Sequence, residues 1–185
     1  MKVIFGLGNP GPRYERTRHN VGFLIIDALA QKHGIKVKDY ACHCLVGEVR
    51  INGKALFLAK PLTYMNLAGI AAKEILEKVR GEVKDILVIT DDADLEMGRI
   101  KIAGRGGDAG HLGVRSVIEN LGSKDFPRVR VGIGRPPEKI DLAEYVLQEF
   151  TEDEWVKMKQ VFSRATEAIE TLVLEGIEKA MQRYN

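Results

Sequence analysis

The chain has few cysteines, no long apolar run and little net charge, and each shortage excludes a class of protein. Its two cysteines, Cys42 and Cys44, cannot build a disulfide scaffold, and so few are typical of a reducing compartment such as the cytoplasm. No apolar run approaches the roughly 20 residues that span a bilayer, so we expect no membrane segment and no membrane partner. Because the formal charge is only +2, any nucleic acid must be bound by a local basic surface.

What is present is the composition of a globular protein. Of its residues 45% are hydrophobic and 29% are charged, and 185 residues suffice to bury a full core. No repeat, linker or low-complexity tract divides the chain. The sequence therefore predicts a single domain over residues 1–185.

Strand patterns alternate with helix patterns along the chain. The apolar run 86–89 is typical of a central strand buried on both faces, and Asn52-Gly53 is a strong hairpin signal. We expect Asn20 to cap the first helix and Lys60-Pro61 to end the second hairpin strand. The expected strands are 3–5, 45–51, 55–59, 86–89, 99–103 and 128–133, and the expected helices are about 20–33, 66–79, from the end of the loop 104–113 to 121, and 151–172. This order predicts an α/β sandwich, with a mostly parallel mixed β-sheet flanked by helices.

A glycine-rich loop follows the first expected strand. Gly6, Gly8 and Gly11 match the spacing of a dinucleotide-binding loop, in which backbone N–H groups at the start of a helix meet the pyrophosphate. Pro10 and Pro12 remove two such donors, and a polar run delays the apolar helix. We therefore reject a dinucleotide site.

Polar side chains follow several of the expected core strands. Asn9 and His19 come after the first strand, Asn66 after the hairpin, and Asp91 and Asp92 after the buried central strand. Ligands of open α/β sheets bind at the carboxyl ends of the strands, so these groups are candidates to meet at one site. A carboxylate would hold one ring nitrogen of His19 while the other takes a proton from water, and the amides would orient an acyl group. These loops contain no serine or cysteine, which favours direct attack by water.

Each of these residues also has a purely structural interpretation. Asn9 fits a tight turn, and Asn66 fits a helix N-cap. Asp91, Asp92 and Asp94 fit a solvated loop or a set of carboxylate ligands for a divalent metal. Spacing alone leaves these alternatives open.

Four segments carry a further signal. They are Gly6-Leu7-Gly8-Asn9-Pro10-Gly11 with Thr17-Arg18-His19-Asn20, then Lys60-Pro61-Leu62-Thr63-Tyr64-Met65-Asn66, Asp91-Asp92-Ala93-Asp94-Leu95, and Phe126-Pro127-Arg128-Val129-Arg130-Val131-Gly132-Ile133-Gly134-Arg135-Pro136. In this order, and over essentially the whole chain, they resemble the motifs of bacterial peptidyl-tRNA hydrolases. The resemblance implies release of peptides from tRNA by cleavage of the ester between the peptide carboxyl and the terminal ribose. It also implies a monomer that needs no metal or other cofactor.

By matching position, the resemblance assigns roles to single residues. His19 would be the general base, Asp91 its orienting partner, and Asn9 and Asn66 would contact the peptide or the reacting carbonyl. The other binding residues would be Tyr14 at the tRNA 3′ end, Met65 in the peptide cleft and Arg130 at a tRNA phosphate.

The chain departs from the family pattern in and next to the loop 104–113, which is its second glycine-rich loop. Leu112 stands where the family has an asparagine that helps to place water and peptide, and a lost site hydrogen bond costs about 1–3 kcal/mol. Ala103 stands where the family has a basic residue at a tRNA phosphate, although Lys101 or Arg105 could substitute for it. We expect His111 in this loop to contact substrate; the alternative is a turn residue.

We therefore predict a peptidyl-tRNA hydrolase-type esterase and keep two alternatives. The first is an RNA-binding relative with weakened or lost hydrolase activity, which Leu112 and Ala103 favour. The second is a metal-dependent phosphoryl enzyme that uses Asp91, Asp92 and Asp94.

Two remaining patterns are weaker. Cys42-His43-Cys44 has no second ligand pair at zinc spacing, and on a strand the two cysteines would share one face and pack. Arg128, Arg130, Arg135 and Lys139 form either a basic strip for RNA or an exposed strand face.

Overall fold

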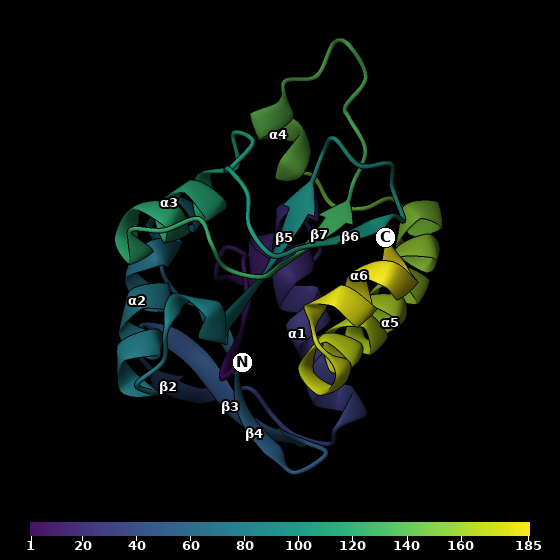
Figure 1. The fold of residues 1–185 in the computed structure, drawn as a ribbon. Coiled ribbons are helices and arrows are strands. Elements are labelled where there is room, and N and C mark those ends of the chain that lie inside the picture. The colour runs from purple at the N-terminus through teal and green to yellow at the C-terminus, as the bar shows by residue number, and fades with distance from the viewer.

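A seven-stranded β-sheet runs through the middle of the computed structural model, which describes residues 1–185 (Figure 1). Its strands are β1 (Val3–Gly6), β2 (Asp39–Ala41), β3 (Cys44–Ile51), β4 (Lys54–Pro61), β5 (Ile86–Asp92), β6 (Ile100–Ala103) and β7 (Arg128–Gly132). The helices are α1 (Val21–Lys32), α2 (Ala68–Lys78), α3 (Leu112–Leu121), α4 (Leu142–Val146), α5 (Glu152–Glu175) and α6 (Ile177–Tyr184). The strands lie in the order β2-β3-β4-β1-β5-β7-β6.

Parallel strands occupy the middle of the sheet and antiparallel pairs its edges. β1 pairs in parallel with β4 and with β5, and β5 pairs in parallel with β7. β2, β3 and β4 form an antiparallel meander at one edge, and β6 runs antiparallel to β7 at the other. The predicted α/β sandwich with a mixed sheet is confirmed. Because the central strands are parallel, their carboxyl ends all lie at one edge.

Side chains that alternate along the central strands feed two separate cores. Ile4 and Leu87 face the layer of α1, α5 and α6, whereas Val3 and Phe5 face the layer of α2 and α3. Figure 1 shows these two helical layers on opposite sides of the sheet. The continuous apolar run in β5 is buried on both faces, as predicted, and the apolar stripe of α5 packs into the first core.

The connection between β3 and β4 is the tight turn that its sequence predicts. Asn52 and Gly53 have φ angles of 47° and 82°, the left-handed values that a type I′ hairpin turn requires. β4 continues through Pro61, so the predicted strand end before Lys60-Pro61 is wrong. Proline is tolerated there because it is the last residue of the strand, where a missing N–H interrupts no further pairing.

The segment before β3 differs from the prediction. Cys42 and His43 have φ angles of 53° and 52° and form the turn between β2 and β3, so the two cysteines do not share one strand face. The antiparallel pairing of β2 with β3 imposes this turn on residues that have little turn preference of their own. Burial raises the pKa of the Cys44 thiol to about 12, so this thiol stays protonated at neutral pH and packs as a small apolar side chain.

β2, α4 and α6 are absent from the predicted elements. β2 and α4 have only three and five residues, too few for a hydrophobic period to show. α6 follows α5 after the single residue Gly176, which has a φ of 93°.

The helices do not meet the requirements of a lipid bilayer. None of them has both the length and the apolar character needed to cross a membrane.

Two asparagines that fit helix caps do not cap. Asn20 occupies the N-cap position of α1, but its side chain makes no cap hydrogen bond, so α1 forgoes about 1 kcal/mol. Asn66 lies inside the 3₁₀ turn Met65–Leu67, ahead of α2. By contrast, Thr151 and Glu154 form a capping box at the start of α5, with bonds of 3.3 and 2.8 Å. The side chain of Asn20 is therefore available for another contact.

Gly53→Ala tests the β3–β4 turn. A Cβ on Gly53 would meet no atom within 4 Å, so the substitution adds only the cost of a left-handed backbone. We expect the free energy of unfolding, measured in urea, to fall by about 1–2 kcal/mol. Gly107→Ala is the matched control, because its Cβ also meets no atom within 4 Å while its φ lies outside the left-handed region. Equal losses in both variants would contradict the turn assignment.

Candidate active site

The loops after the central strands meet at the carboxyl edge of the sheet. β1 leads into the loop of Asn9 and then into the turn Arg18–Asn20, β4 leads to Met65, and β5 carries Asp91 near its end. Since β4, β1 and β5 are adjacent and parallel, these carboxyl ends lie side by side. The amino end of α3, preceded by His111, joins them.

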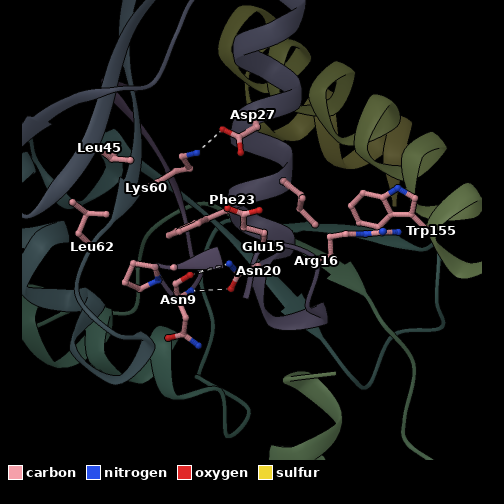
Figure 2. A pocket seen from close by; sticks show the side chains of 13 residues that line it. Asn9, Glu15, Arg16, Asn20, Phe23, Asp27, Leu45, Lys60, Leu62 and Trp155 are labelled. Carbon is pink, nitrogen blue, oxygen red and sulfur yellow. Dashed lines mark hydrogen bonds and ion pairs between the residues drawn. The ribbon is translucent and has the colours of Figure 1, made fainter. Parts of the chain in front are cut away.

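Asn9 is held at both its side chain and its backbone. Its Oδ1 accepts a hydrogen bond of 2.9 Å from the backbone N–H of Met65, and its own N–H and C=O bond the side chain of Asn20 at 2.9 Å each. Figure 2 shows Asn20 bridging to the Asn9 backbone while the Asn9 amide points away from it. Asn9 is 7% exposed, and with Oδ1 occupied, its Nδ2 remains to donate to a ligand.

A cavity of about 380 Å³ lies beside Asn9, between α1 and the β3–β4 hairpin (Figure 2). Its lining includes Phe23, Leu45, Leu62 and the ion pair of Lys60 with Asp27, which closes at 2.6 Å. Neither His19 nor Asp91 lines it. The buried pair of His19 and Asp91 is therefore not part of this cavity.

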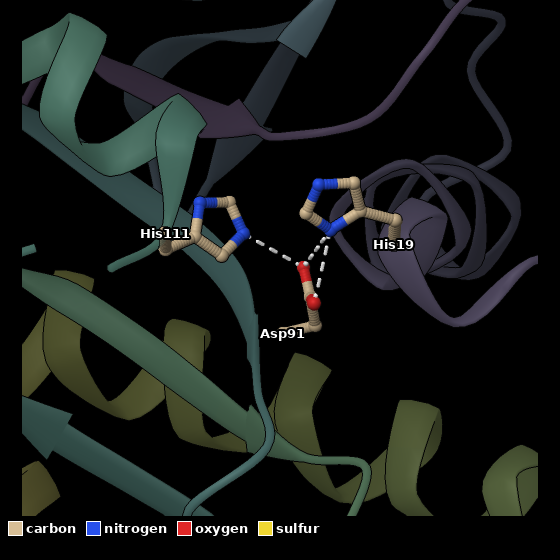
Figure 3. A group of neighbouring side chains, drawn as sticks. All are labelled: His19, Asp91 and His111. Atoms are coloured by element: carbon tan, nitrogen blue, oxygen red, sulfur yellow. Dashed lines mark hydrogen bonds and ion pairs between the residues drawn. The ribbon is translucent and has the colours of Figure 1, made fainter. Parts of the chain in front are cut away.

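His19 and Asp91 form a buried pair (Figure 3). His19 Nδ1 lies 3.0 Å from both carboxylate oxygens of Asp91, and the two residues are 9% and 4% exposed. An ionised carboxylate only accepts hydrogen bonds, so Nδ1 carries the proton and Nε2 is left as an acceptor. The pair has the arrangement of a general base held by an orienting carboxylate.

His111 holds the other side of the same carboxylate (Figure 3). Its Nε2 lies 2.9 Å from Asp91 Oδ1, and its Nδ1 accepts the N–H groups of Gly113 and Val114 at 3.1 and 3.2 Å, which caps α3. Because Nδ1 is an acceptor, Nε2 carries the proton and donates it to Asp91. Both ring nitrogens are thus used within the chain. His111 therefore supports Asp91, and its expected contact with substrate stays a prediction.

The same contacts set the pKa values of the pair. Burial lowers the pKa of His19, but the negative charge and the hydrogen bond of Asp91 outweigh burial and raise this pKa above 6.5. Burial by itself raises the pKa of Asp91, yet electrostatic attraction and hydrogen bonds from His19 and His111 hold it well below its usual range. Asp91 is therefore ionised at neutral pH.

The three groups also have the composition of a metal site. His19, Asp91 and His111 offer ligand atoms that lie within 4.8 Å of one another. Their mutual hydrogen bonds of 2.9 and 3.0 Å already satisfy the carboxylate and one nitrogen of each ring. The geometry of the three residues is thus accounted for by hydrogen bonding.

The carboxylates at the end of β5 do not share a site. Asp91 and Asp92 are consecutive strand residues, so their side chains point to opposite faces. Asp92 pairs with Arg130 at 2.5 Å, and Asp94 pairs with Arg135. A metal centre built on these three aspartates does not form, and the phosphoryl-transfer alternative loses its ligands.

The arginines of β7 lie in two different environments. Arg128 is 2% exposed and donates to the carbonyl oxygens of Gly107 and Lys124 at 2.8 and 3.2 Å, so it fastens the second glycine-rich loop. Arg130 is partly buried and lies directly across from Lys101 of β6. The expected basic strip therefore excludes Arg128, because backbone carbonyls occupy its guanidinium.

The remaining binding candidates differ in exposure. Leu112 is 52% exposed as the first residue of α3, and Asn66 is exposed on its turn. Tyr14 is partly exposed, and its hydroxyl accepts a hydrogen bond from Arg13. Met65 is 4% exposed, so its side chain belongs to the core and only its backbone N–H reaches Asn9.

The sequence does not show the contacts that two further residues near the site make. Asn20 fits a helix cap, and Arg18 stands in a polar run rich in arginine. Arg18 is nevertheless 4% exposed, and it donates to the carbonyl oxygens of Gln148 and Glu149 at 3.2 and 2.9 Å. It ties the turn Arg18–Asn20 to the segment between α4 and α5. Partners 130 positions away are not visible in a local pattern.

Three comparisons relate the chain to known proteins. The family model described as "Peptidyl-tRNA hydrolase" matches residues 3–185. The peptidyl-tRNA hydrolase of Thermotoga sp. (strain RQ2) is 46% identical over 183 residues, which are 99% of this chain and 96% of that protein. The one from Desulforudis audaxviator (strain MP104C) is 47% identical over 185 residues, 100% of this chain and 93% of that protein. A crystal structure of peptidyl-tRNA hydrolase from Acinetobacter baumannii aligns with a TM-score of 0.94 at 33% identity, covering 100% of this chain and 94% of that one.

Asp91→Asn should lower the pKa of His19. The substitution removes the carboxylate charge but keeps the burial, so we expect this pKa to move from above 6.5 to below 6.5. Titration of the histidine Cε1–H signals by NMR measures the change. His33 and His43 serve as internal references, because they pair with other carboxylates. A His19 pKa that is the same in both proteins would show that Asp91 does not control it.

Proposed function

The chain belongs to the peptidyl-tRNA hydrolase family, and we propose that His19 is the general base with which it hydrolyses the ester between a peptide and the terminal ribose of tRNA. The observation that carries this proposal is the 3.0 Å contact of His19 Nδ1 with Asp91, which leaves Nε2 as an acceptor. Only neutral His19 accepts a proton. Because Asp91 raises its pKa above 6.5, activity falls as the pH drops through that raised value.

The chemical steps use the two ring nitrogens differently. Water attacks the ester carbonyl carbon while its proton moves to His19 Nε2, and the Nδ1–H bond to Asp91 stabilises the imidazolium that forms. The bond from the acyl carbon to the ribose oxygen then breaks, and Nε2 returns the proton to that oxygen. The products are the peptide acid and tRNA. His111, 2.9 Å from Asp91, keeps the carboxylate in place throughout.

Asn9 supplies a donor on the acyl side. Its Nδ2 is available because Oδ1 accepts from Met65, and a preorganised donor stabilises the oxyanion that develops on the carbonyl oxygen. Asn66, exposed on the turn that begins with Met65, contacts the peptide. No serine or cysteine hydrogen-bonds to His19, which supports water as the nucleophile.

Arg130 and Lys101 are the phosphate contacts of this proposal. They lie opposite each other on β7 and β6, so their side chains share one face of the sheet. Lys101 compensates for Ala103, because phosphate contacts are electrostatic and tolerant of position. Asp92 pairs with Arg130, so an incoming phosphate competes with Asp92 for that guanidinium. Tyr14 lies beside the tRNA 3′ end in this arrangement.

The proposal includes a cytoplasmic monomer that acts without a metal or other cofactor. All the residues assigned to the reaction come from one chain, so the proposed reaction needs no residue from a second copy. The two cysteines are unpaired thiols, as suits a reducing compartment. Apart from Leu112 and Ala103, no observation favours the alternative of an RNA-binding relative without activity, since His19, Asp91 and Asn9 have an arrangement suited to catalysis.

The first test compares release of an N-acetyl-aminoacyl group from tRNA by the wild-type chain and by His19→Ala. Loss of the general base should lower kcat by about 10²–10⁴-fold. His33→Ala is the matched control and should keep full activity, because His33 pairs with Glu170 of α5. Excess EDTA should leave the wild-type rate unchanged. If the wild-type chain binds this tRNA without cleaving it, the esterase proposal fails and the RNA-binding alternative replaces it.

Leu112→Asn tests the departure in the second glycine-rich loop. An amide at this exposed position restores a group that hydrogen-bonds water or peptide, and about 1 kcal/mol of such stabilisation raises kcat about 5-fold. Leu112→Ala is the control, since it removes the apolar side chain without adding a polar group, and it should show no gain. A wild-type rate that Leu112→Asn does not improve would indicate that another group has taken over this role.

A further inference from the structure

Asn20 occupies a cap position without serving as a cap. It directly precedes α1, is 2% exposed and makes no side-chain hydrogen bond to the helix. Both of its polar atoms bond Asn9 instead: Nδ2 donates to the Asn9 carbonyl and Oδ1 accepts the Asn9 N–H, each at 2.9 Å. One side chain thus replaces the backbone partner that a neighbouring strand would provide.

The Asn9 backbone requires such a partner because the chain has left the sheet there. β1 ends at Gly6, and Leu7 makes the next bond to the adjacent strand, at 2.9 Å. Asn9 is buried, and buried N–H and C=O groups without partners are costly, so Asn20 satisfies both. The loop is therefore anchored by a side chain that lies 11 positions further along the chain.

Two contacts together orient the side-chain amide of Asn9. Met65 N–H occupies Oδ1 of Asn9 at 2.9 Å, so the amide cannot rotate without losing that bond, and Asn20 fixes the backbone from which the amide projects. Figure 2 shows the Asn9 amide extending away from Asn20. His19 immediately precedes Asn20 in the same 3₁₀ turn. This turn therefore fixes the position of Asn9 Nδ2 relative to the ring of His19.

We propose that Asn20 is a positioning residue for ester hydrolysis. It holds the side chain of Asn9 at a fixed position relative to His19. The inference rests on the proposed roles of His19 and Asn9. Misplacement of a reacting group by about 1 Å costs roughly 10²-fold in rate. Removing the Asn20 amide is therefore expected to lower kcat by about 10- to 100-fold, with a smaller change in KM.

The decisive experiment is a double-mutant cycle. kcat and KM are measured for the wild-type chain, Asn20→Ala, Asn9→Ala and the double variant. If Asn20 acts through Asn9, Asn20→Ala should cost less than about 3-fold in the Asn9→Ala background. The acid limb of the pH–rate profile should stay where it is, because the contact of His19 with Asp91 is untouched. The same fold-loss in both backgrounds would overturn the proposal.

Two further variants separate positioning from stability. Thr166→Val removes a buried hydroxyl that donates to the Ser163 carbonyl at 2.7 Å within α5, and it should lower Tm without changing kcat. Asn20→Asp keeps the acceptor for the Asn9 N–H but turns a buried carboxylate oxygen toward the Asn9 carbonyl, so it should lower kcat at least as much as Asn20→Ala. If Asn20→Ala does not fold, Asn20→Ser provides the cycle, because serine is a favoured N-cap residue for α1 but cannot make both bonds to the Asn9 backbone. A loss of kcat in Thr166→Val as large as in Asn20→Ala would contradict a specific role for Asn20.

Amide hydrogen exchange tests the same contact without catalysis. In Asn20→Ala the Asn9 N–H should exchange at least about 10-fold faster, while the Leu7 N–H, bonded to Ile89, stays protected. Unchanged exchange at Asn9 would overturn the inference. If the wild-type chain cleaves no ester, the proposed function fails separately, and the exchange rates still decide whether Asn20 holds Asn9.

Discussion

The buried carboxylate of Asp91 is the group on which the arrangement of the site depends. An ionised carboxylate that is 4% exposed must be paired and hydrogen-bonded, because an uncompensated buried charge is strongly destabilising. His19 and His111 meet this requirement from two different segments, the turn before α1 and the residue that caps α3. The charge at the end of β5 therefore joins three parts of the chain, and the same bonds that stabilise it define which nitrogen of His19 remains basic.

Hydrogen bonds between neutral groups hold Asn9 in a similar way. Asn9 is fixed through its backbone by Asn20 and through its side chain by the Met65 N–H, so its position does not rely on exposed side chains. Asn20 gives up the capping of α1 to do this. Because His19 and Asn20 are consecutive, one 3₁₀ turn carries both the proposed base and the side chain that holds Asn9. The geometry is thus set by a short turn that Arg18 in turn ties to the segment before α5.

The backbone of the second glycine-rich loop is held by Arg128, a residue outside the loop. Arg128 binds the carbonyl oxygens of Gly107 and Lys124, so its grip on the loop does not depend on which side chains the loop carries. His111 keeps its contact with Asp91 although the next residue is Leu112 and the loop is preceded by Ala103. The departures from the family pattern at Leu112 and Ala103 therefore involve neither of the two side chains that hold the carboxylate of Asp91.

From the sequence alone one could predict the α/β order, the Asn52-Gly53 turn, the buried strand 86–89 and the loops that carry Asn9, His19 and Asp91. These features follow from local periodicity, turn chemistry and motif spacing, which a linear chain displays directly. Only the tertiary structure decided the turn at Cys42-His43 and the partners of the other site residues. His19 lies 72 positions from Asp91 and Arg18 lies 130 positions from Gln148. A hydrogen bond between such distant groups depends on how the sheet brings strand ends together, and no local pattern specifies which buried donor meets which acceptor.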